Sequence, residues 1–150
     1  MDRHEVRFRE VVKMVDGQSI DDSVGSKTSS VVKEILIIDD DQDILNLFDD
    51  FLSKEGYKVT PYLDSLKALN AIRGSPQRYS LIITDIRMPG MTGLELTKRI
   101  YAINQSIKII LMSAFEIDGD DLKELSYENF IKKPIHMHVF AETIGKILED

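Results

Sequence analysis

The sequence predicts an α/β fold, a doubly wound sheet of five parallel strands with helices packed on both faces. Two observations lead to this prediction. Five short apolar segments begin 22 to 26 residues apart, and between them lie amphipathic stretches with the helical period of about 3.6 residues. Strands that alternate with helices require right-handed crossovers, which make the strands parallel and place helices on both faces. The length of 150 residues suits one domain.

The predicted strands are the apolar segments themselves. Their bounds are Ile35–Ile38, Tyr57–Tyr62, Leu81–Thr84, Ile107–Met112 and Asn129–Lys132. The first, third and fourth are apolar without alternation, as expected of strands that are covered on both faces. The second alternates in part and contains Pro61, which cannot donate a backbone hydrogen bond to a neighbouring strand. We therefore expect the second strand to lie at an edge of the sheet.

Five helices are predicted in the remaining segments. Their apolar positions are Ile44, Leu47, Phe48, Phe51 and Leu52; Leu66, Leu69 and Ile72; Leu94, Leu96, Ile100 and Ile103; Leu122 and Leu125; and Val139, Phe140, Ile144, Ile147 and Leu148. The first helix ends at Gly56, which suits a left-handed C-cap, and the second follows Asp64–Ser65, which can cap a helix start. The fourth helix is short and would begin at Asp120 or Asp121.

Residues 1–34 are predicted to form an N-terminal extension outside the compact domain. Residues 17–30 contain six Ser or Thr and two Gly, with too few apolar side chains to offset the entropy of ordering them. The extension is therefore expected to be flexible. Residues 5–15 carry several apolar side chains and could form a weak helix, which would either fray or dock on the domain. The domain itself is predicted to span residues 35–150.

The composition excludes several classes of function. The chain has 19 Lys and Arg against 26 Asp and Glu, a formal net charge of −7, which disfavours nucleic-acid binding through a general basic surface. There is no Cys, which removes disulfides, thiolate zinc sites and a Cys nucleophile. The N-terminus lacks the apolar stretch of a secretory signal, and no segment reaches the ~20 apolar residues of a membrane helix. A cytoplasmic protein without membrane insertion is expected.

Polar residues follow four of the predicted strands directly. Asp39–Asp41 follow the first strand, Asp85 the third, Ser113 the fourth and Lys133 the fifth. In an open parallel sheet, ligands bind in the crevice outside the carboxyl ends of the strands. We therefore expect these carboxylates, this hydroxyl and this ammonium group to converge at one edge of the sheet.

This combination of groups indicates chemistry on a phosphoryl group. One Asp of Asp39–Asp41 is explained as a helix N-cap, but that explanation does not reach Asp85. Crowded carboxylates raise one another's pKa unless a cation shares their site, and hard oxygen ligands suit Mg²⁺. A carboxylate in such a site can act as a nucleophile and form an aspartyl phosphate, with Lys133 and Ser113 contacting the transferred group.

Residues 35–150 resemble a response-regulator receiver domain of the two-component phosphorelay family. The resemblance covers ILIIDDD, LIITDIRMPGMTGLEL, IILMSA, FIKKP and the terminal amphipathic helix, in that order. The motif D-x-x-M-P-G-M-x-G after an apolar strand is highly specific. The resemblance implies a flavodoxin-like fold with strand order 2-1-3-4-5. It also implies a phosphorylation-activated signalling switch, which is not an enzyme but catalyses its own phosphorylation and dephosphorylation.

The resemblance also implies partners and a metal site. A histidine kinase or phosphotransfer protein would donate a phosphoryl group to Asp85 in a reaction that depends on Mg²⁺ or Mn²⁺. Asp39, Asp40, Asp85 and the backbone carbonyl of Arg87 would hold the metal ion. Because the sequence ends after the last helix, the signal would pass by noncovalent contact to an unknown downstream protein, unless the chain is a fragment of a longer one.

Further roles follow from the same resemblance. Ser113 would be the switch hydroxyl, Phe130 the switch aromatic residue, and Lys133 the ion-pair partner of the phosphoryl group, with a cis bond between Lys133 and Pro134. Lys132 matches less well, because the family's Lys directly precedes Pro. Phe130 has no hydroxyl, so a partner could contact only its ring.

Two side chains are predicted to control the lifetime of the phosphorylated state. Arg87 lies two residues beyond Asp85, and Phe115 lies two residues beyond Ser113. If they overhang the site, a guanidinium group would stabilise the charged product and a phenyl ring would shield it from water. The alternative is that both face solvent and serve only the partner surface.

Other functions have less support from the residues. The D-x-D pattern of Asp39–Asp41 is similar to that of phosphatases of the haloacid dehalogenase superfamily, but their second acid pair is not found. A phosphorylation-independent interaction module with the receiver fold is the other alternative, and the complete set of chemical positions argues against it. A calcium loop starting at Asp39 is rejected, because Ile44 and Asp50 stand where it needs Gly and Glu. His136 and His138 are expected to be surface residues.

Overall fold

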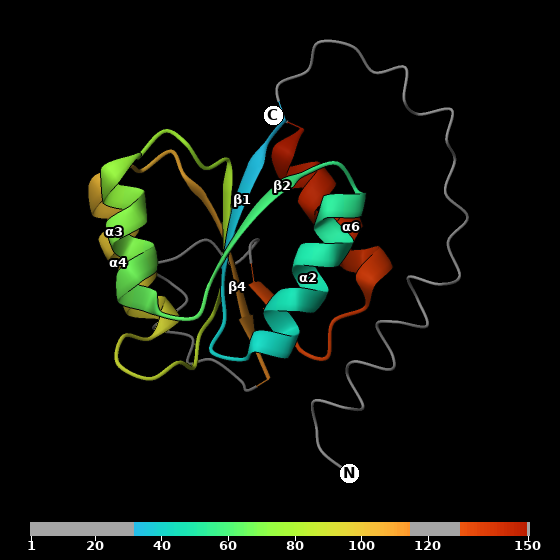
Figure 1. The fold of residues 1–150 in the computed structure, drawn as a ribbon, viewed down its shortest axis with the longest axis horizontal. Coiled ribbons are helices and arrows are strands. Elements are labelled where there is room, and N and C mark those ends of the chain that lie inside the picture. Colours follow the sequence, from blue (N-terminus) through green and yellow to red (C-terminus); the bar gives the residue numbers. More distant parts are fainter. Residues whose placement is uncertain (1–31, 115–129, 150) are drawn as a thin grey trace.

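The computed structural model describes residues 32–114 and 130–149, and these form an α/β structure built on one five-stranded parallel sheet (Figure 1). The strands are β1 (Glu34–Ile38), β2 (Lys58–Tyr62), β3 (Leu81–Asp85), β4 (Lys108–Ser113) and β5 (Phe130–Lys132). Their order is β2-β1-β3-β4-β5, and every neighbouring pair is parallel. The predicted fold class and strand order are thereby confirmed.

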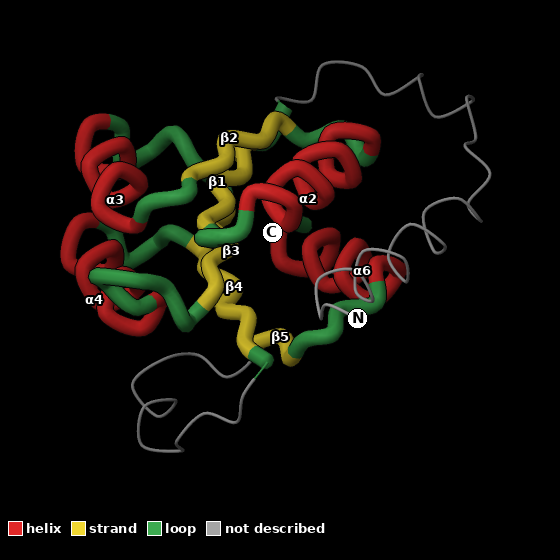
Figure 2. Tube along the Cα trace, turned by 60° about the horizontal axis from the view of Figure 1, so that its bottom comes forward, coloured by secondary structure: helices red, strands yellow, loops and turns green. Residues whose placement is uncertain are grey.

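Helices cover both faces of the sheet. They are α2 (Gln42–Lys54), α3 (Ser65–Gly74), α4 (Gly93–Ile103) and α6 (Met137–Leu148). Figure 2 shows α2 and α6 on one side of the sheet and α3 and α4 on the other. Four of the five predicted helices are thus present in the described parts of the chain. The remaining one, predicted from residue 120 or 121, lies outside the described residues, as does the possible helix at residues 5–15.

Two apolar cores, one on each face, hold the strands in place. Ile35 and Ile37 of β1 face the core under α2 and α6, whereas Leu36 and Ile38 face the core under α3 and α4. All five residues of β1 are buried, which explains why its sequence is apolar without alternation. Strand β2 contains Pro61 and lies at the edge of the sheet, as predicted.

The helix ends agree with the caps that the sequence predicts. Asp64 accepts hydrogen bonds from the backbone N–H groups of Leu66 and Lys67 at 2.8 and 3.1 Å, and so caps the start of α3. Gly56 follows the last turn of α2 with φ at +98°, the left-handed conformation that Gly adopts without steric cost. These caps fix where the chain leaves each helix.

The buried face of α3 differs from the predicted one. Leu66 is 53% exposed, and the buried positions are Ser65, Ala68, Leu69 and Ile72. These four follow the spacing i, i+3, i+4, i+7 of one helical face, whereas the spacing of three that selected Leu66 drifts away from that face. Val139, also predicted as apolar face, is 47% exposed at the start of α6.

A network of hydrogen bonds around Glu34 lies at the end of the sheet where β1 begins. The carboxylate of Glu34 accepts hydrogen bonds from Arg78 Nε at 3.0 and 3.1 Å and from Thr60 Oγ1 at 2.8 Å. Burial acts to raise the pKa of Glu34, but the hydrogen bonds from Arg78 and Thr60 outweigh it and hold the pKa below its usual value. The network joins β1 to β2 and to the segment before β3.

No helix within residues 32–114 and 130–149 is long and apolar enough to cross a membrane.

The conformation of Gly56 generates a stability prediction. Replacing Gly56 with Ala should lower the free energy of unfolding by about 1 kcal/mol, because an L side chain is strained at positive φ. Gly74, at the end of α3, is the matched control, since no atom lies within 4 Å of a Cβ placed there and its φ is not positive. Urea unfolding should show a loss for Gly56→Ala alone, and equal effects of the two substitutions would contradict the assignment.

Candidate functional site

Three carboxylates meet where β1 and β3 end. Asp39 and Asp40 follow β1 directly, and Asp85 is the last residue of β3, the neighbouring strand. Each offers a carboxylate oxygen that lies within 4.8 Å of the other two. Asp39 is 1% exposed and Asp85 9%, whereas Asp40 faces outward. The carboxylates that were expected to converge at this edge of the sheet do so.

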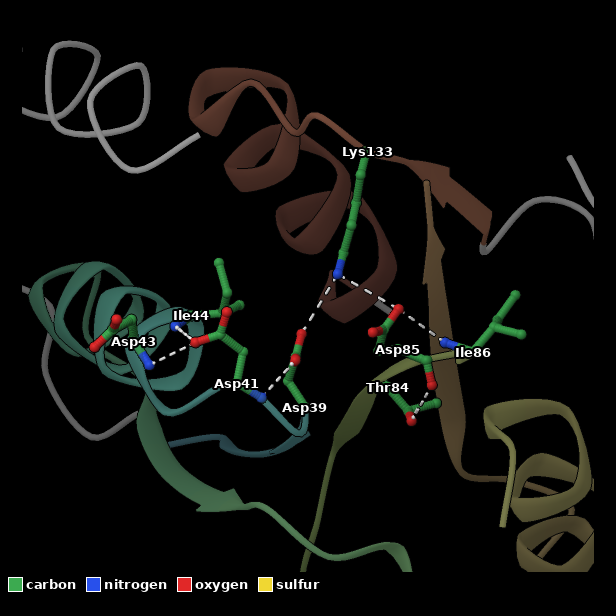
Figure 3. A network of polar contacts seen from close by, with 8 residues as sticks. All are labelled: Asp39, Asp41, Asp43, Ile44, Thr84, Asp85, Ile86 and Lys133. Atoms are coloured by element: carbon green, nitrogen blue, oxygen red, sulfur yellow. Dashed lines mark hydrogen bonds and ion pairs between the residues drawn. The ribbon is translucent and has the colours of Figure 1, made fainter. Parts of the chain in front are cut away.

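A lysine that follows β5, the strand at the other edge of the sheet from β2, lies between two of these carboxylates (Figure 3). Lys133 Nζ is 3.5 Å from Asp39 Oδ2 and 3.4 Å from Asp85 Oδ1. The residue is 8% exposed, and it directly follows β5 with a cis peptide bond to Pro134. The neighbouring Lys132 is exposed. Of the two adjacent lysines, Lys133 is therefore the one that the structure directs into the cluster.

Backbone N–H groups orient the two buried carboxylates. Asp39 Oδ1 accepts a hydrogen bond from the N–H of Asp41 at 3.0 Å, and Asp85 Oδ1 accepts one from the N–H of Ile86 at 3.0 Å. Asp41 itself is the N-cap of α2, with its side chain accepting from the N–H groups of Asp43 and Ile44. The run of three aspartates therefore divides into a helix cap and two members of the cluster.

The cluster contains more carboxylates than ammonium groups, and burial makes their ionised form costly. Burial raises the pKa of Asp39 to about 6, an effect that the Lys133 ammonium opposes and the Asp85 carboxylate strengthens. Burial likewise raises the pKa of Asp85, again against the influence of Lys133. One ammonium group faces three carboxylates here. A further cation would relieve the repulsion that remains.

The donor set fits a hard divalent cation. Carboxylate oxygens are the ligands that Mg²⁺ prefers, and Mg²⁺ sites in proteins commonly combine one or two carboxylates with water and phosphate oxygens. Asp39, Asp40 and Asp85 supply such oxygens close together and at the rim of the sheet. Asp40 is exposed, so an ion held by these oxygens would be open to water on that side.

The other predicted site residues in the described part of the chain lie on β4, on β5 and in the loop after β3. Ser113 ends β4 and is buried, and its carbonyl accepts the N–H of Lys133 at 2.8 Å. Phe130 begins β5, is half-buried and packs against the core beneath α3 and α4. Arg87 is exposed in the loop after β3. Phe115, the second residue predicted to affect lifetime, lies outside the described residues.

Two residues next to Asp85 were missed in the sequence. Thr84 is fully buried, and its hydroxyl donates to the Asp85 carbonyl at 2.9 Å. Gly93 begins α4, and a Cβ at this position would lie 2.3 Å from the Asp85 carbonyl oxygen. The motif D-x-x-M-P-G-M-x-G contains Gly93 and could have suggested a close backbone approach. No pattern in the sequence singles out Thr84.

Comparisons with known proteins agree with this geometry. The family model described as response regulator receiver domain matches residues 35–145, so the chain belongs to that family. It is 32% identical over 118 residues to sporulation initiation phosphotransferase F of Bacillus subtilis, which covers 77% of this chain and 94% of the relative. It is 33% identical over 122 residues to the polar-differentiation response regulator DivK of Brucella anthropi, covering 79% and 98% respectively.

Solved structures give the same result. The crystal structure of a CheY-like response regulator receiver domain protein from Methanospirillum hungatei superposes with a TM-score of 0.73 at 26% identity. The match covers 79% of this chain and 95% of that one. Family membership places the chain among the signalling proteins of two-component systems.

The raised pKa of Asp39 predicts how stability depends on pH when metal is removed. Because the folded chain holds the Asp39 proton up to about pH 6, and the usual value is 3.8, folding is favoured below pH 4 and this contribution is lost as pH rises through 6. In EDTA, the free energy of unfolding should therefore contain a component that falls over this interval. The fall should be smaller in the Asp39→Asn variant, in which Asp85 still contributes a raised pKa.

Millimolar Mg²⁺ should counteract the loss, because the ion binds the ionised cluster of the folded chain. Urea unfolding at pH 5 and pH 7, with EDTA or with Mg²⁺, measures both effects. The stabilisation by Mg²⁺ should be larger at pH 7 than at pH 5. A melting temperature that is insensitive to Mg²⁺ at pH 7 would count against a metal site.

Proposed function

We propose that this chain is a phosphorylation-activated signalling switch that accepts a phosphoryl group on Asp85 from a histidine kinase or phosphotransfer protein. The observation that carries the proposal is the ammonium group of Lys133 between Asp39 and Asp85. A lone buried ion pair would need one carboxylate, whereas this lysine faces two that already repel each other. Such an arrangement suits a site that takes up a further cation and an anionic group together.

In the proposed reaction, an oxygen of Asp85 attacks the phosphorus atom of a phosphohistidine. The new bond joins this oxygen to phosphorus, and the bond between phosphorus and the imidazole nitrogen breaks, leaving its electron pair on the nitrogen. Asp85 has one oxygen held by the Ile86 N–H and Lys133, so the carboxylate is oriented before the donor arrives. The Lys133 ammonium is positioned to neutralise charge on the phosphoryl oxygens.

Mg²⁺ or Mn²⁺ would be held by Asp39, Asp40, Asp85 and the backbone carbonyl of Arg87. The ion would supply charge neutralisation for the phosphoryl oxygens. Asp39 is oriented for this purpose by the N–H of Asp41, and its burial keeps competing water away from one side of the site. The buried carboxylates then need no other cation than this ion and Lys133.

The response to phosphorylation is assigned to Ser113 and Phe130. Ser113 ends β4 and is joined through its carbonyl to Lys133, and Phe130 lies on the adjacent strand β5. Movement of the Ser113 hydroxyl toward the phosphoryl group would shift the end of β4 against β5. The half-buried ring of Phe130 on β5 could then change its packing. The downstream target would read that change by noncovalent contact. Arg87 and Phe115 remain assigned to the lifetime of the phosphorylated state.

A phosphorylation-independent interaction module is the second candidate function. The buried cluster argues against it, because three crowded carboxylates around one lysine cost stability that a purely structural domain would not need to give up. The name of the B. subtilis relative, a phosphotransferase, favours phosphoryl chemistry as well.

Phosphoryl uptake tests the proposal directly. Incubation with Mg²⁺ and acetyl phosphate should add the mass of one phosphoryl group to the wild-type chain, measured by intact mass spectrometry. The Asp85→Asn variant should add none and should remain folded, since losing one of three crowded carboxylates relieves repulsion. Asp41→Asn is the control, because Asp41 caps α2 and lies outside the cluster. A wild-type chain without the added mass would refute the assignment.

The two adjacent lysines should differ in their effects. Lys133→Ala should slow phosphorylation on the order of 100-fold, because it removes the ammonium group beside Asp85. Lys132→Ala should have little effect, because Lys132 is exposed, whereas adjacent residues of an extended chain face opposite ways and Lys133 is the one buried beside Asp85. Initial rates of uptake at saturating Mg²⁺ measure both. Equal defects would mean that Lys133 acts through the fold and not on the phosphoryl group.

A further inference from the structure

The peptide carbonyl of Asp85 is held by an unusual donor. In the register of β3 with β1, the last pair is Ile38 with Thr84, so Asp85 lies one residue past the part of β3 that pairs with β1, while it still pairs with Met112 of β4. The hydroxyl of Thr84 donates to it at 2.9 Å (Figure 3). Thr84 is 0% exposed, so the hydroxyl and the carbonyl meet in a buried space where an alternative water partner is scarce.

This carbonyl belongs to the same rigid unit as a group that orients the Asp85 side chain. A peptide bond is planar, so the carbonyl of Asp85 and the N–H of Ile86 move together. The Ile86 N–H donates to Asp85 Oδ1 at 3.0 Å and also to the Met112 carbonyl of β4 at 2.9 Å. The Thr84 hydroxyl therefore binds the carbonyl of this peptide unit, and the N–H of the same unit binds the Asp85 carboxylate.

Gly93 keeps the space beside this plane open. A Cβ at position 93 would lie 2.3 Å from the Asp85 carbonyl oxygen and 2.9 Å from Ile86 Cα, both closer than real Cβ contacts. The N–H of Gly93 donates to the Ile86 carbonyl at 2.8 Å, which ties the start of α4 to the next peptide unit. The plane at Asp85 is thus bounded by α4 and oriented by Thr84.

Packing alone does not call for a hydroxyl at position 84. Ile82 and Ile86, which share the face of β3 with Thr84 by strand alternation, belong to the apolar core beneath α3 and α4. Val has nearly the same shape as Thr and would fill this position without a polar group. The hydroxyl is therefore best explained by the bond that it makes to the Asp85 carbonyl.

We propose that Thr84 is a positioning residue for the phosphoacceptor, which sets the Asp85–Ile86 peptide plane and through it the direction of the Asp85 carboxylate. The inference rests on the proposed function, because it assigns Thr84 a part in phosphoryl uptake. Thr84 does not touch the phosphoryl group. It acts through the Ile86 N–H, so its loss misdirects the nucleophile without removing any charge from the site.

The test compares three variants by their initial rate of uptake from acetyl phosphate at saturating Mg²⁺. Thr84→Val should be about tenfold slower at saturating donor, because a small misplacement of a nucleophile is costly, and the donor concentration for half-maximal rate should not change. Thr84→Ser keeps the hydroxyl and should restore the rate. Thr60→Val is the control, since the Thr60 hydroxyl also donates a hydrogen bond, to Glu34 at 2.8 Å, and lies on β2, which is not adjacent to β3.

A second measurement reports on geometry and not on rate. Hydrogen exchange of the Ile86 amide, followed by NMR, should be faster in Thr84→Val than in wild type and in Thr60→Val, at matched global stability. Thr84→Cys, a weaker donor of similar size, should fall between Thr84→Val and wild type in both measurements, and it replaces Thr84→Val should that variant fail to fold.

The outcomes separate this inference from the proposed function. A phosphorylated wild-type chain together with an equally fast Thr84→Val variant overturns the positioning role alone. Equal slowing by Thr84→Val and Thr60→Val also overturns it, because the loss of any donating hydroxyl would then suffice. A wild-type chain that takes up no phosphoryl group overturns the proposed function, and the role of Thr84 in uptake falls with it.

Discussion

The interaction on which the site depends is that of one buried ammonium group with two buried carboxylates. Asp39 and Asp85 come from neighbouring strands, and each would be costly to ionise away from water. Lys133 reaches both from beyond β5, across the width of β4. The charge of Lys133 offsets part of that cost. The negative charge that is not neutralised attracts a cation. The cluster therefore lowers the stability of the fold and at the same time can bind a cation, a combination that is common at functional sites.

The rest of the fold keeps these strand ends in register. Apolar side chains on both faces of β1 and β3 leave the strands no freedom to slip by one residue, because a slip would turn Ile37 and Ile38 to the opposite cores. Asp41 caps α2 directly beyond Asp39, so the chain changes direction where the carboxylate must point into the cluster. The far end of the sheet is closed by the Glu34 network, away from the chemistry.

Around Asp85, contacts fix the position of the backbone as well as that of the side chain. The close approach of Gly93, the N–H of Ile86 and the hydroxyl of Thr84 all act on one or two peptide units. A nucleophile that must meet phosphorus in line benefits from this rigidity, because orientation is then settled before the donor binds. Arg87, two residues beyond Asp85, is exposed.

The sequence by itself determined the fold class, the strand order through its family resemblance, the edge position of the strand with Pro61, and the cluster of Asp39, Asp40, Asp85 and Lys133. The fold class, the edge strand and the convergence of these side chains follow from periodicity and from residues that stand directly after strands, which are local features, whereas the strand order follows from the resemblance. Only the tertiary structure decided that Leu66 is exposed and that Thr84 and Gly93 meet at the Asp85 carbonyl. Those outcomes depend on the distance between segments far apart in the chain, and on the direction of single bonds, neither of which a pattern of residue types specifies.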